Sequence, residues 1–322
     1  MLIIDNNITN PYFNIAAEEY LLKSFTDDCF MLYQNTPSII VGKHQNTLAE
    51  INYHFIKQNN IDVIRRLSGG GTVFHDMGNI NFMFIQNIKE GNALVNFRRF
   101  TDPIIEALNH LGVDAKFEGK NDIRVNGLKI SGNAEHIFKR RVLHHGTLLF
   151  SSELNILNDA IKAEMNKYND KGVKSIRSTV TNISDFLVEK ISIPEFKNRV
   201  VKKIFEKNKN STFYSFNPND IKQVEKLVTE KYSTWDWNFG YSPNYDFENK
   251  IDTTNGSLSV NVTVEQGRIE KIKISGNFDS SEIENLLTGK KHNENEIHET
   301  LHKKVIQKDS FYNMDDIIKV LF

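Results

Sequence analysis

Three consecutive glycines, flanked by arginine, serine and histidine, form the stretch of this sequence whose residue types could do chemistry. Residues 65–76 are RRLSGGGTVFHD. Gly69, Gly70 and Gly71 carry no side chains, so their backbone N–H groups can approach an anion closely. Arginine adds fork-shaped donors for phosphate or carboxylate. The stretch predicts an anion-binding turn, although three glycines alone are also typical of an ordinary hairpin.

The elements that position this turn are predicted to be strands. Residues 61–64 form a short apolar run, and apolar residues alternate with other residues at positions 79–85, which is the period of a sheet. A P-loop or a dinucleotide-binding loop would instead lead into a helix and would have a different glycine spacing. Any nucleotide at this turn must be held in another way.

A lysine strand provides a second candidate for anion chemistry. The turn Asn126-Gly127 separates two strand-like arms, which is a strong hairpin signal. In the second arm Lys129 is expected to point away from Leu128 and Ile130. Residues 131–134 (SGNA) are expected to form a second small-residue turn. Two such turns could line a single anion-binding site.

Two histidine patterns also need an interpretation. His144 and His145 lie on a predicted strand, where neighbouring side chains face opposite ways, so at most one of them faces a given site. Residues 298–302 (HETLH) match the zinc-protease pattern H-E-x-x-H. However, Ile297, Leu301 and Val305 lie four residues apart, as on the buried face of a helix. This spacing favours a packed helix over a zinc site.

Composition limits the class of protein. The 322 residues are 39% hydrophobic, enough for a large domain and a smaller one. Lys plus Arg number 40 and Asp plus Glu 41, so no overall charge favours nucleic acid or a membrane surface. The single cysteine, Cys29, excludes an internal disulfide and fits a reducing compartment. No signal peptide and no apolar run of about 18 residues is found. We expect a soluble, cytoplasmic protein.

Helical segments and a change of composition complete the predicted organisation. A helix is expected over residues 15–22 with Asn14 at or near its N-cap; Glu18 there could bring a carboxylate over the sheet, although a solvated position is commoner. Further helices are expected over residues 97–111 and 154–168. After Tyr245, strictly alternating residues at 256–264 and 269–274 predict a hairpin that opens a second, smaller unit.

Taken together, these motifs resemble those of the lipoate-protein ligases. The resemblance rests on residues 65–79, 121–122, 129–134, 144–149, 175–182 and 235–240. It implies an α+β fold related to that of biotin-protein ligase, with a mixed or antiparallel sheet and flanking helices. It also implies a catalytic domain at residues 1–245 and a small α+β accessory domain at residues 246–322.

The implied chemistry has two steps. ATP activates lipoate as lipoyl-adenylate, and a lysine of an apo lipoyl domain then attacks the mixed anhydride. The implied acceptors are 2-oxoacid dehydrogenase complexes and the glycine cleavage H protein. Lys129 would be the catalytic cation between carboxylate and α-phosphate, and Asp122 would bind Mg²⁺. The resemblance assigns lipoate and ATP binding to Arg66, Ser68, Gly69, Gly70, Gly71, Val73, His75, Asn79, Asn121, Asp122, Ser131, Ala134, His145 and Thr147, and closure over the adenylate to Ser175, Arg177 and Thr179.

Two alternatives remain open at this point. Octanoyl and lipoyl transferases of the same superfamily carry the acyl group on a nucleophilic cysteine. Cys29 lies far in sequence from the lysine motif, where such a cysteine is expected. The other alternative is a non-catalytic lipoate-binding protein that has kept the pocket.

Overall fold

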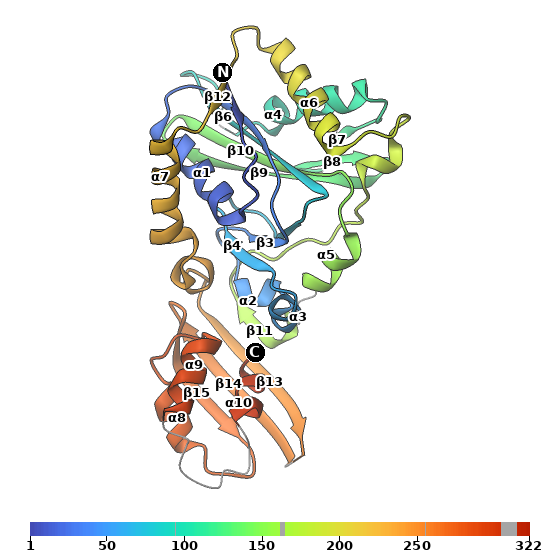
Figure 1. Ribbon diagram of the computed structural model, residues 1–322. Coiled ribbons are helices and arrows are strands. Elements are labelled where there is room, and N and C mark those ends of the chain that lie inside the picture. The colour runs from blue at the N-terminus through green and yellow to red at the C-terminus, as the bar shows by residue number, and fades with distance from the viewer. Residues whose placement is uncertain (94, 162–164, 255, 304–313) are drawn as a thin grey trace. The chain divides into compact units, whose positions relative to one another are not determined.

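The computed structural model describes residues 1–93, 95–161, 165–254, 256–303 and 314–322, which form two compact units. Unit 1 consists of residues 1–43, 61–158 and 175–234, and unit 2 of residues 44–60, 159–174 and 235–322. Figure 1 shows that both units combine helices with β-sheet. The predicted α+β class is confirmed.

Unit 1 is built on an eight-stranded mixed sheet with the order β12-β1-β2-β6-β10-β9-β8-β7. Strand β1 runs parallel to β12 and β2, and the other neighbouring pairs are antiparallel. The strands are β1 (Leu2–Asp5), β2 (Cys29–Tyr33), β6 (Asn79–Asn87), β7 (Lys116–Glu118), β8 (Asp122–Val125), β9 (Leu128–Phe138), β10 (Arg141–Leu149) and β12 (Thr212–Ser215).

Different helices pack on the two faces of this sheet. Ile80, Phe82 and Phe84 of β6 belong to a core that includes residues of α4 (Phe97–His110) and α6 (Ile193–Lys207). The helix α1 (Pro11–Ser24) contacts β6 and β10. The alternation of β6 therefore places the residues between the core phenylalanines on the α1 side. This side, which carries Asn81 and Met83, is called the site face below.

The start of α1 differs from the prediction. Its N-cap is Asn10, whose side chain accepts a hydrogen bond from Phe13 N at 3.1 Å, and Pro11 occupies the first helical position. Asn14 lies inside the helix, fully buried, and its amide donates to Ile8 O and Asn35 Oδ1. The predicted cap at Asn14 is wrong because Asn14 is recruited to tertiary hydrogen bonds.

The glycine turn belongs to a separate three-stranded sheet of unit 1. Strand β3 (Ser38–Val41) lies in the middle, parallel to β4 (Asp62–Arg65) and antiparallel to β5 (Val73–His75). The predicted order of strand, glycine turn and strand is confirmed. The two strands flank β3 rather than pairing with each other, so the turn is not a hairpin. Gly70 has a φ of +88°, which favours glycine.

The β8–β9 hairpin is confirmed, with Asn126 and Gly127 both at positive φ, as a type I′ turn requires. Two other expectations are wrong. Residues 131–134 are not a turn but the middle of β9, because they pair with β8 on one side or β10 on the other. The helix predicted over residues 154–168 ends early: α5 (Leu154–Ala160) is followed by η1 (Met165–Lys167) and β11 (Tyr168–Asp170), which pairs with β13.

Unit 2 contains a four-stranded antiparallel sheet with the order β11-β13-β14-β15. Its strands β13 (Tyr245–Thr253), β14 (Gly256–Glu265) and β15 (Arg268–Ser275) include the predicted hairpin, which is confirmed. Leu258, Val260, Val262 and Val264 are buried on one face. The α-helices in the described part of unit 2 are α2 (Thr47–Glu50), α3 (Tyr53–Gln58), α8 (Ser281–Leu287), α9 (Glu294–His302) and α10 (Met314–Leu321).

The remaining helical segments of the chain are short. They are η2 (Ile183–Phe186), α7 (Pro218–Leu227) and the π-helical η3 (Val228–Tyr232) and η4 (Asp236–Gly240). In the described parts of the chain, every helix is too short or too polar to cross a membrane.

The H-E-x-x-H segment lies on α9. Ile297 and Leu301 are buried, as predicted for a packed helix, whereas Val305 lies outside the described residues. The rings of His298 and His302 stack on each other with 6.0 Å between centroids. Among the residues that the structure describes, no three His, Cys, Asp or Glu side chains are grouped to hold a metal ion.

Candidate active site

The glycine turn is shaped by Arg66. Its Nε donates to Ser68 Oγ at 3.0 Å, and its terminal nitrogens donate to the carbonyl oxygens of Ile40 at 2.9 Å, Gly69 at 2.6 Å and Gly71 at 2.8 Å. Burial lowers the pKa of Arg66 to about 10, so it remains a cation at neutral pH. Arg66 therefore fixes the turn through its carbonyl groups and leaves a buried positive charge beneath it.

A chain of buried polar side chains connects the turn to the large sheet. Ser68 Oγ lies 2.6 Å from His145 Nε2, and His145 Nδ1 lies 2.7 Å from Glu18 Oε2. The other carboxylate oxygen of Glu18 accepts a hydrogen bond from Tyr33 Oη at 2.9 Å. This array draws one residue each from the turn, β10, α1 and β2, and it belongs entirely to unit 1.

The neighbouring His144 faces the other way, as predicted for adjacent residues of a strand. Its ring stacks on Phe100 with 4.8 Å between centroids, in the core opposite the site face. Its Nδ1 lies 3.1 Å from Glu135 Oε1. Burial lowers the pKa of His144. Only His145 of the pair reaches the glycine turn.

His75 lies at the end of β5 in a second buried network. Its Nδ1 is 2.9 Å from Asn35 Nδ2, and Asn35 in turn accepts from Asn14. Burial, together with the charges of Arg66 and His145, lowers the pKa of His75 to about 3. The imidazole is therefore neutral at pH 7, accepts at Nδ1 and carries its hydrogen on Nε2.

Lys129 reaches the site face because of an irregularity in β9. Asp122 is opposite Gly132 in the pairing of β8 with β9, whereas Arg124 is opposite Lys129, so β9 contains one extra residue between these pairs. Residues opposite each other share a face, which places Lys129 beside Gly132. Lys129 Nζ lies 2.8 Å from Asp122 Oδ1, and Arg124 donates to Asp122 Oδ2 at 2.7 Å.

The predicted closing segment lies between the glycine turn and Lys129. Ser175 Oγ accepts a hydrogen bond from Thr72 N at 2.9 Å. Further along, Lys129 N donates to Thr179 O, and Thr181 N donates to Lys129 O, each at 3.0 Å. Arg177 and Thr179 are exposed. The segment thus contacts both anion-site elements, while two of its side chains extend to solvent.

The other predicted residues are placed as follows. Thr147 Oγ1 accepts from Gly132 N at 3.2 Å, and Ala134 is opposite His145, so both belong to the site face. Asn79 starts β6 and donates to Asn81 Oδ1 at 2.9 Å. Val73 is half-buried in β5 opposite Ile40.

The side chains of two residues predicted to bind substrate form hydrogen bonds within the protein instead. Ser131 is opposite Ile123, on the core side of β9, and accepts from Asn133 Nδ2 at 3.2 Å, so the structure does not bring its side chain to Lys129. The Asn121 amide donates to Asn133 O at 2.5 Å. Their assignments to substrate binding stay predictions.

Sequence reasoning left Glu18 unassigned and missed Tyr33 and Asn35. A signal for Glu18 exists in α1, because Glu18 is three or four residues from Ile15, Leu21 and Leu22 and shares their side of the helix. The apolar side of an amphipathic helix faces the core. A carboxylate within it must then have partners, which for Glu18 are His145 and Tyr33.

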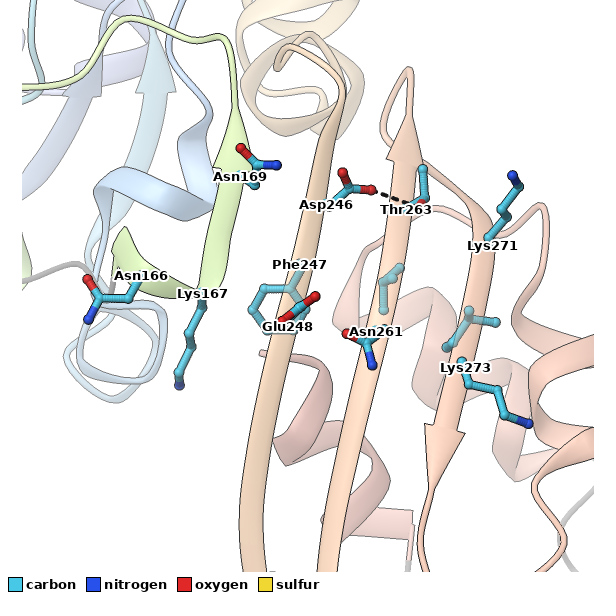
Figure 2. A pocket seen from close by; sticks show the side chains of 12 residues that line it. Asn166, Lys167, Asn169, Asp246, Phe247, Glu248, Asn261, Thr263, Lys271 and Lys273 are labelled. Atoms are coloured by element: carbon cyan, nitrogen blue, oxygen red, sulfur yellow. Dashed lines mark hydrogen bonds between the residues drawn. The ribbon is translucent and has the colours of Figure 1, made fainter.

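A second concave surface lies on the polar face of the sheet of unit 2. Figure 2 shows the side chains of β13, β14 and β15 that line it, with Asp246 accepting a hydrogen bond from Thr263 at 2.8 Å. Lys271 and Lys273 extend from β15 on the same face. The hollow mixes acidic and basic groups and contains none of the predicted site residues.

Comparison with known proteins assigns both parts of the chain. Residues 10–205 match the model of the lipoyl protein ligase A/B catalytic domain, and residues 242–321 match that of the bacterial lipoate protein ligase C-terminus. The lipoate-protein ligase LplJ of Bacillus subtilis is 44% identical over 94% of this chain and 93% of its own. Lipoate–protein ligase 1 of Staphylococcus aureus is 44% identical over 93% and 92%.

Solved structures agree with these matches. A lipoate-protein ligase A bound with ATP has a TM-score of 0.64 and 25% identity, covering 74% of this chain and 98% of its own. LipL1 of P. falciparum in complex with lipoate has a TM-score of 0.63 and 26% identity, covering 99% and 98%.

Proposed function

Because the chain belongs to the lipoyl protein ligase A/B family, we propose that the glycine turn and Lys129 of unit 1 form its acyl-adenylating site. The protein is a lipoate-protein ligase, which activates lipoate with ATP and transfers the lipoyl group to protein. We propose below which residues perform the two steps and which proteins accept the lipoyl group.

The position of Lys129 is the observation that supports this proposal most strongly. In the first step the lipoate carboxylate attacks the α-phosphate of ATP, so two anions must approach each other. A cation between them lowers the barrier. Lys129 is the cation of the site face that lies beside Gly132 and is connected by the 175–181 segment to the glycine turn. In the part of the chain that the structure describes, Nζ of Lys129 forms an ion pair with Asp122, and a salt bridge can exchange for a phosphate.

Asp122 is the proposed Mg²⁺ ligand. Magnesium in nucleotide sites is usually held by one or two carboxylates together with substrate phosphates. Asp122 fits this donor set because it lies next to Lys129, and its two oxygens form ion pairs with Lys129 and Arg124 that phosphate and metal could replace. When bound, the ion would supply positive charge to the phosphates of ATP.

The protein acceptors are proposed to be the apo lipoyl domains of 2-oxoacid dehydrogenase complexes and the glycine cleavage H protein. We further propose that residues 1–245 carry catalysis, that residues 246–322 form an accessory domain, and that the protein acts in the cytoplasm. The buried thiol of Cys29 supports the last point, since it is suited to a reducing compartment.

A transferase mechanism through Cys29 is not favoured by the structure. Cys29 lies in β2 with no solvent exposure, and burial raises the pKa of its thiol to about 12. A nucleophilic cysteine needs the opposite, an accessible thiol with a lowered pKa.

The test is an assay of purified protein with lipoate, ATP and Mg²⁺. We expect pyrophosphate release that depends on lipoate, followed by lipoylation of a panel of apo lipoyl domains and H protein. Octanoate in place of lipoate measures the acyl preference. Lipoylation from an acyl-thioester donor without ATP would contradict the proposal.

A further inference from the structure

The array of Ser68, His145 and Glu18 has the arrangement of a proton-accepting relay. The three side chains are 1%, 8% and 2% exposed. The two links measure 2.6 Å and 2.7 Å. A hydroxyl, an imidazole and a carboxylate in this order hold the imidazole so that its free nitrogen accepts a proton from the hydroxyl side.

The neighbouring groups set the direction of these hydrogen bonds. Tyr33 is fully buried and its pKa is raised well above the usual value, so its hydroxyl stays protonated and donates to Glu18. The Glu18 carboxylate is then an acceptor for the Nδ1–H of His145. Arg66 Nε donates to Ser68 Oγ, so the Ser68 hydroxyl is free to donate its own hydrogen to His145 Nε2.

The ligase reaction requires a proton acceptor in its second step. The acceptor lysine has a pKa of about 10.4 when unperturbed and is an ammonium ion at neutral pH. An ammonium ion has no lone pair with which to attack the lipoyl-adenylate. Lys129, as a cation that serves the first step, cannot remove this proton.

We propose that the array of Ser68, His145 and Glu18 accepts the proton of the attacking lysine in the transfer step; this inference rests on the proposed function. The lysine nitrogen forms a bond to the lipoyl carbonyl carbon, and the bond from that carbon to the phosphate oxygen breaks, with the electron pair leaving on AMP. The ammonium nitrogen loses two protons on becoming an amide. The first passes through Ser68 Oγ to His145 Nε2 so that the amine can attack, and Glu18 stabilises the imidazolium; the second leaves with the phosphate of AMP. Ser68 and His145 act as catalytic residues and Glu18 as a positioning residue.

The placement of the array fits this role. His145 and Thr147 share one face of β10, and Thr147 is hydrogen-bonded to Gly132, which lies beside Lys129. The cation of the first step and the base of the second therefore share the site face. Among the described residues other than its two chain neighbours, no heavy atom lies within 4 Å of the position that a Cβ on Gly69 would occupy, so the turn is open at the residue that follows Ser68.

His75 is the nearest competing base, and its environment disfavours it. Its Nδ1 is already engaged by Asn35, and its pKa is lowered to about 3, so it binds a proton poorly. His145 instead has a carboxylate partner for the proton that it would gain. A purely structural role, in which the array only ties the glycine turn to the sheet, is the other competing interpretation.

The test uses the variant Glu18→Gln, which lacks the negative charge next to His145. The two steps of the reaction are measured separately in this variant. Pyrophosphate release reports the first step. Transfer of preformed lipoyl-adenylate to the lysine of an apo lipoyl domain reports the second. Hydroxamate formation from enzyme-bound adenylate and hydroxylamine, corrected for the reaction without enzyme, serves as a comparison reaction. Hydroxylamine is largely neutral at pH 7, so it can attack the adenylate without first giving up a proton to a base. Glu19→Gln is the matched control, since Glu19 is a buried carboxylate of α1 that pairs with Lys23 and Lys231 instead.

We expect Glu18→Gln to lower lysine transfer by about a hundredfold, the usual range for a general base, while pyrophosphate release and hydroxamate formation stay within a few fold of the parent. Glu19→Gln should not show this split. Unchanged lysine transfer, or an equal fall of all three rates in a folded variant, would overturn the proposal. If Glu18→Gln does not fold, Ser68→Ala is judged by the ratio of lysine transfer to hydroxamate formation. Absence of pyrophosphate release in the parent protein would instead refute the proposed function.

Discussion

Replacing Lys129 by alanine should slow adenylation a hundredfold or more without unfolding the protein. The Lys129 and Asp122 side chains are 23% and 13% exposed, so their ion pair contributes at most about 1 kcal/mol to stability. Asp122 also keeps Arg124 as a partner at 2.7 Å, so the substitution leaves no unpaired buried carboxylate. Loss of a preorganised cation at the transition state costs about 2.7–4 kcal/mol, or a hundredfold to a thousandfold in rate. The expected rise in the activation free energy is therefore several times larger than the expected loss of unfolding free energy.

The assay is lipoate-dependent pyrophosphate release, with thermal unfolding measured on the same preparations. Lys116→Ala is the matched control, because Lys116 forms an ion pair of similar length, 2.7 Å, with Asp114 but is 65% exposed. We expect the control to adenylate at the parental rate. If Lys129→Ala adenylates within a few fold of the parent, the role assigned to this lysine is wrong.

Four further substitutions test other parts of the structure. Gly132→Ala would place a methyl group 3.0 Å from the Lys129 amino group, so adenylation should fall about tenfold or more while the melting temperature barely changes. Cys29→Ala should retain ligation, and iodoacetamide should label the native parent slowly; loss of transfer in a folded variant would restore the transferase alternative. Gly78→Ala would place its Cβ 2.2 Å from Ser151 O, and denaturant unfolding should show a loss of about 3 kcal/mol or more. Burial lowers the pKa of His292 to about 4, so the unfolded state binds more protons between about pH 4 and 6.5, and stability decreases as the pH is lowered through that window. Tryptophan fluorescence of unit 2 should show a loss of about 2 kcal/mol between pH 7 and 5, reduced in His292→Gln.

The sequence predicted the elements whose pattern is local and strong. Alternation was sufficient to predict β6, β14 and β15 as strands, and the Asn126-Gly127 turn was sufficient to predict a hairpin, because these signals lie within a few residues of each other. Residues 168–170 show where this reasoning fails. Their strand exists because β13 offers a partner far along the chain, and a single-sequence pattern contains no information on that pairing.

The site shows a related limit. Ser68, His145 and Lys129 could be proposed from residue type and motif, but Glu18 could not be assigned, because its role depends on α1 crossing the sheet at His145. Long-range placement of this kind makes a solvated glutamate and a buried one look alike in sequence. The position of Glu18 on the same side of the helix as Ile15, Leu21 and Leu22 was the signal available in the sequence.

The face occupied by Lys129 follows from one extra residue. Strict alternation along β9 would place Lys129 on the same side as Ser131, which is buried towards the core. The bulge changes the phase, so that Lys129 shares the face of Gly132 and Asp122. The charge of Lys129 can thus reach the site only because the strand is irregular there, and bulges are common next to active sites for this reason. Deleting one residue between Lys129 and Gly132 would make the pairing regular and leave the lysine on the face of Gly132. Adding one residue to β8 between Asp122 and Arg124 would instead restore strict alternation along β9 and turn the lysine towards the core, where a charge without a partner is too costly to bury.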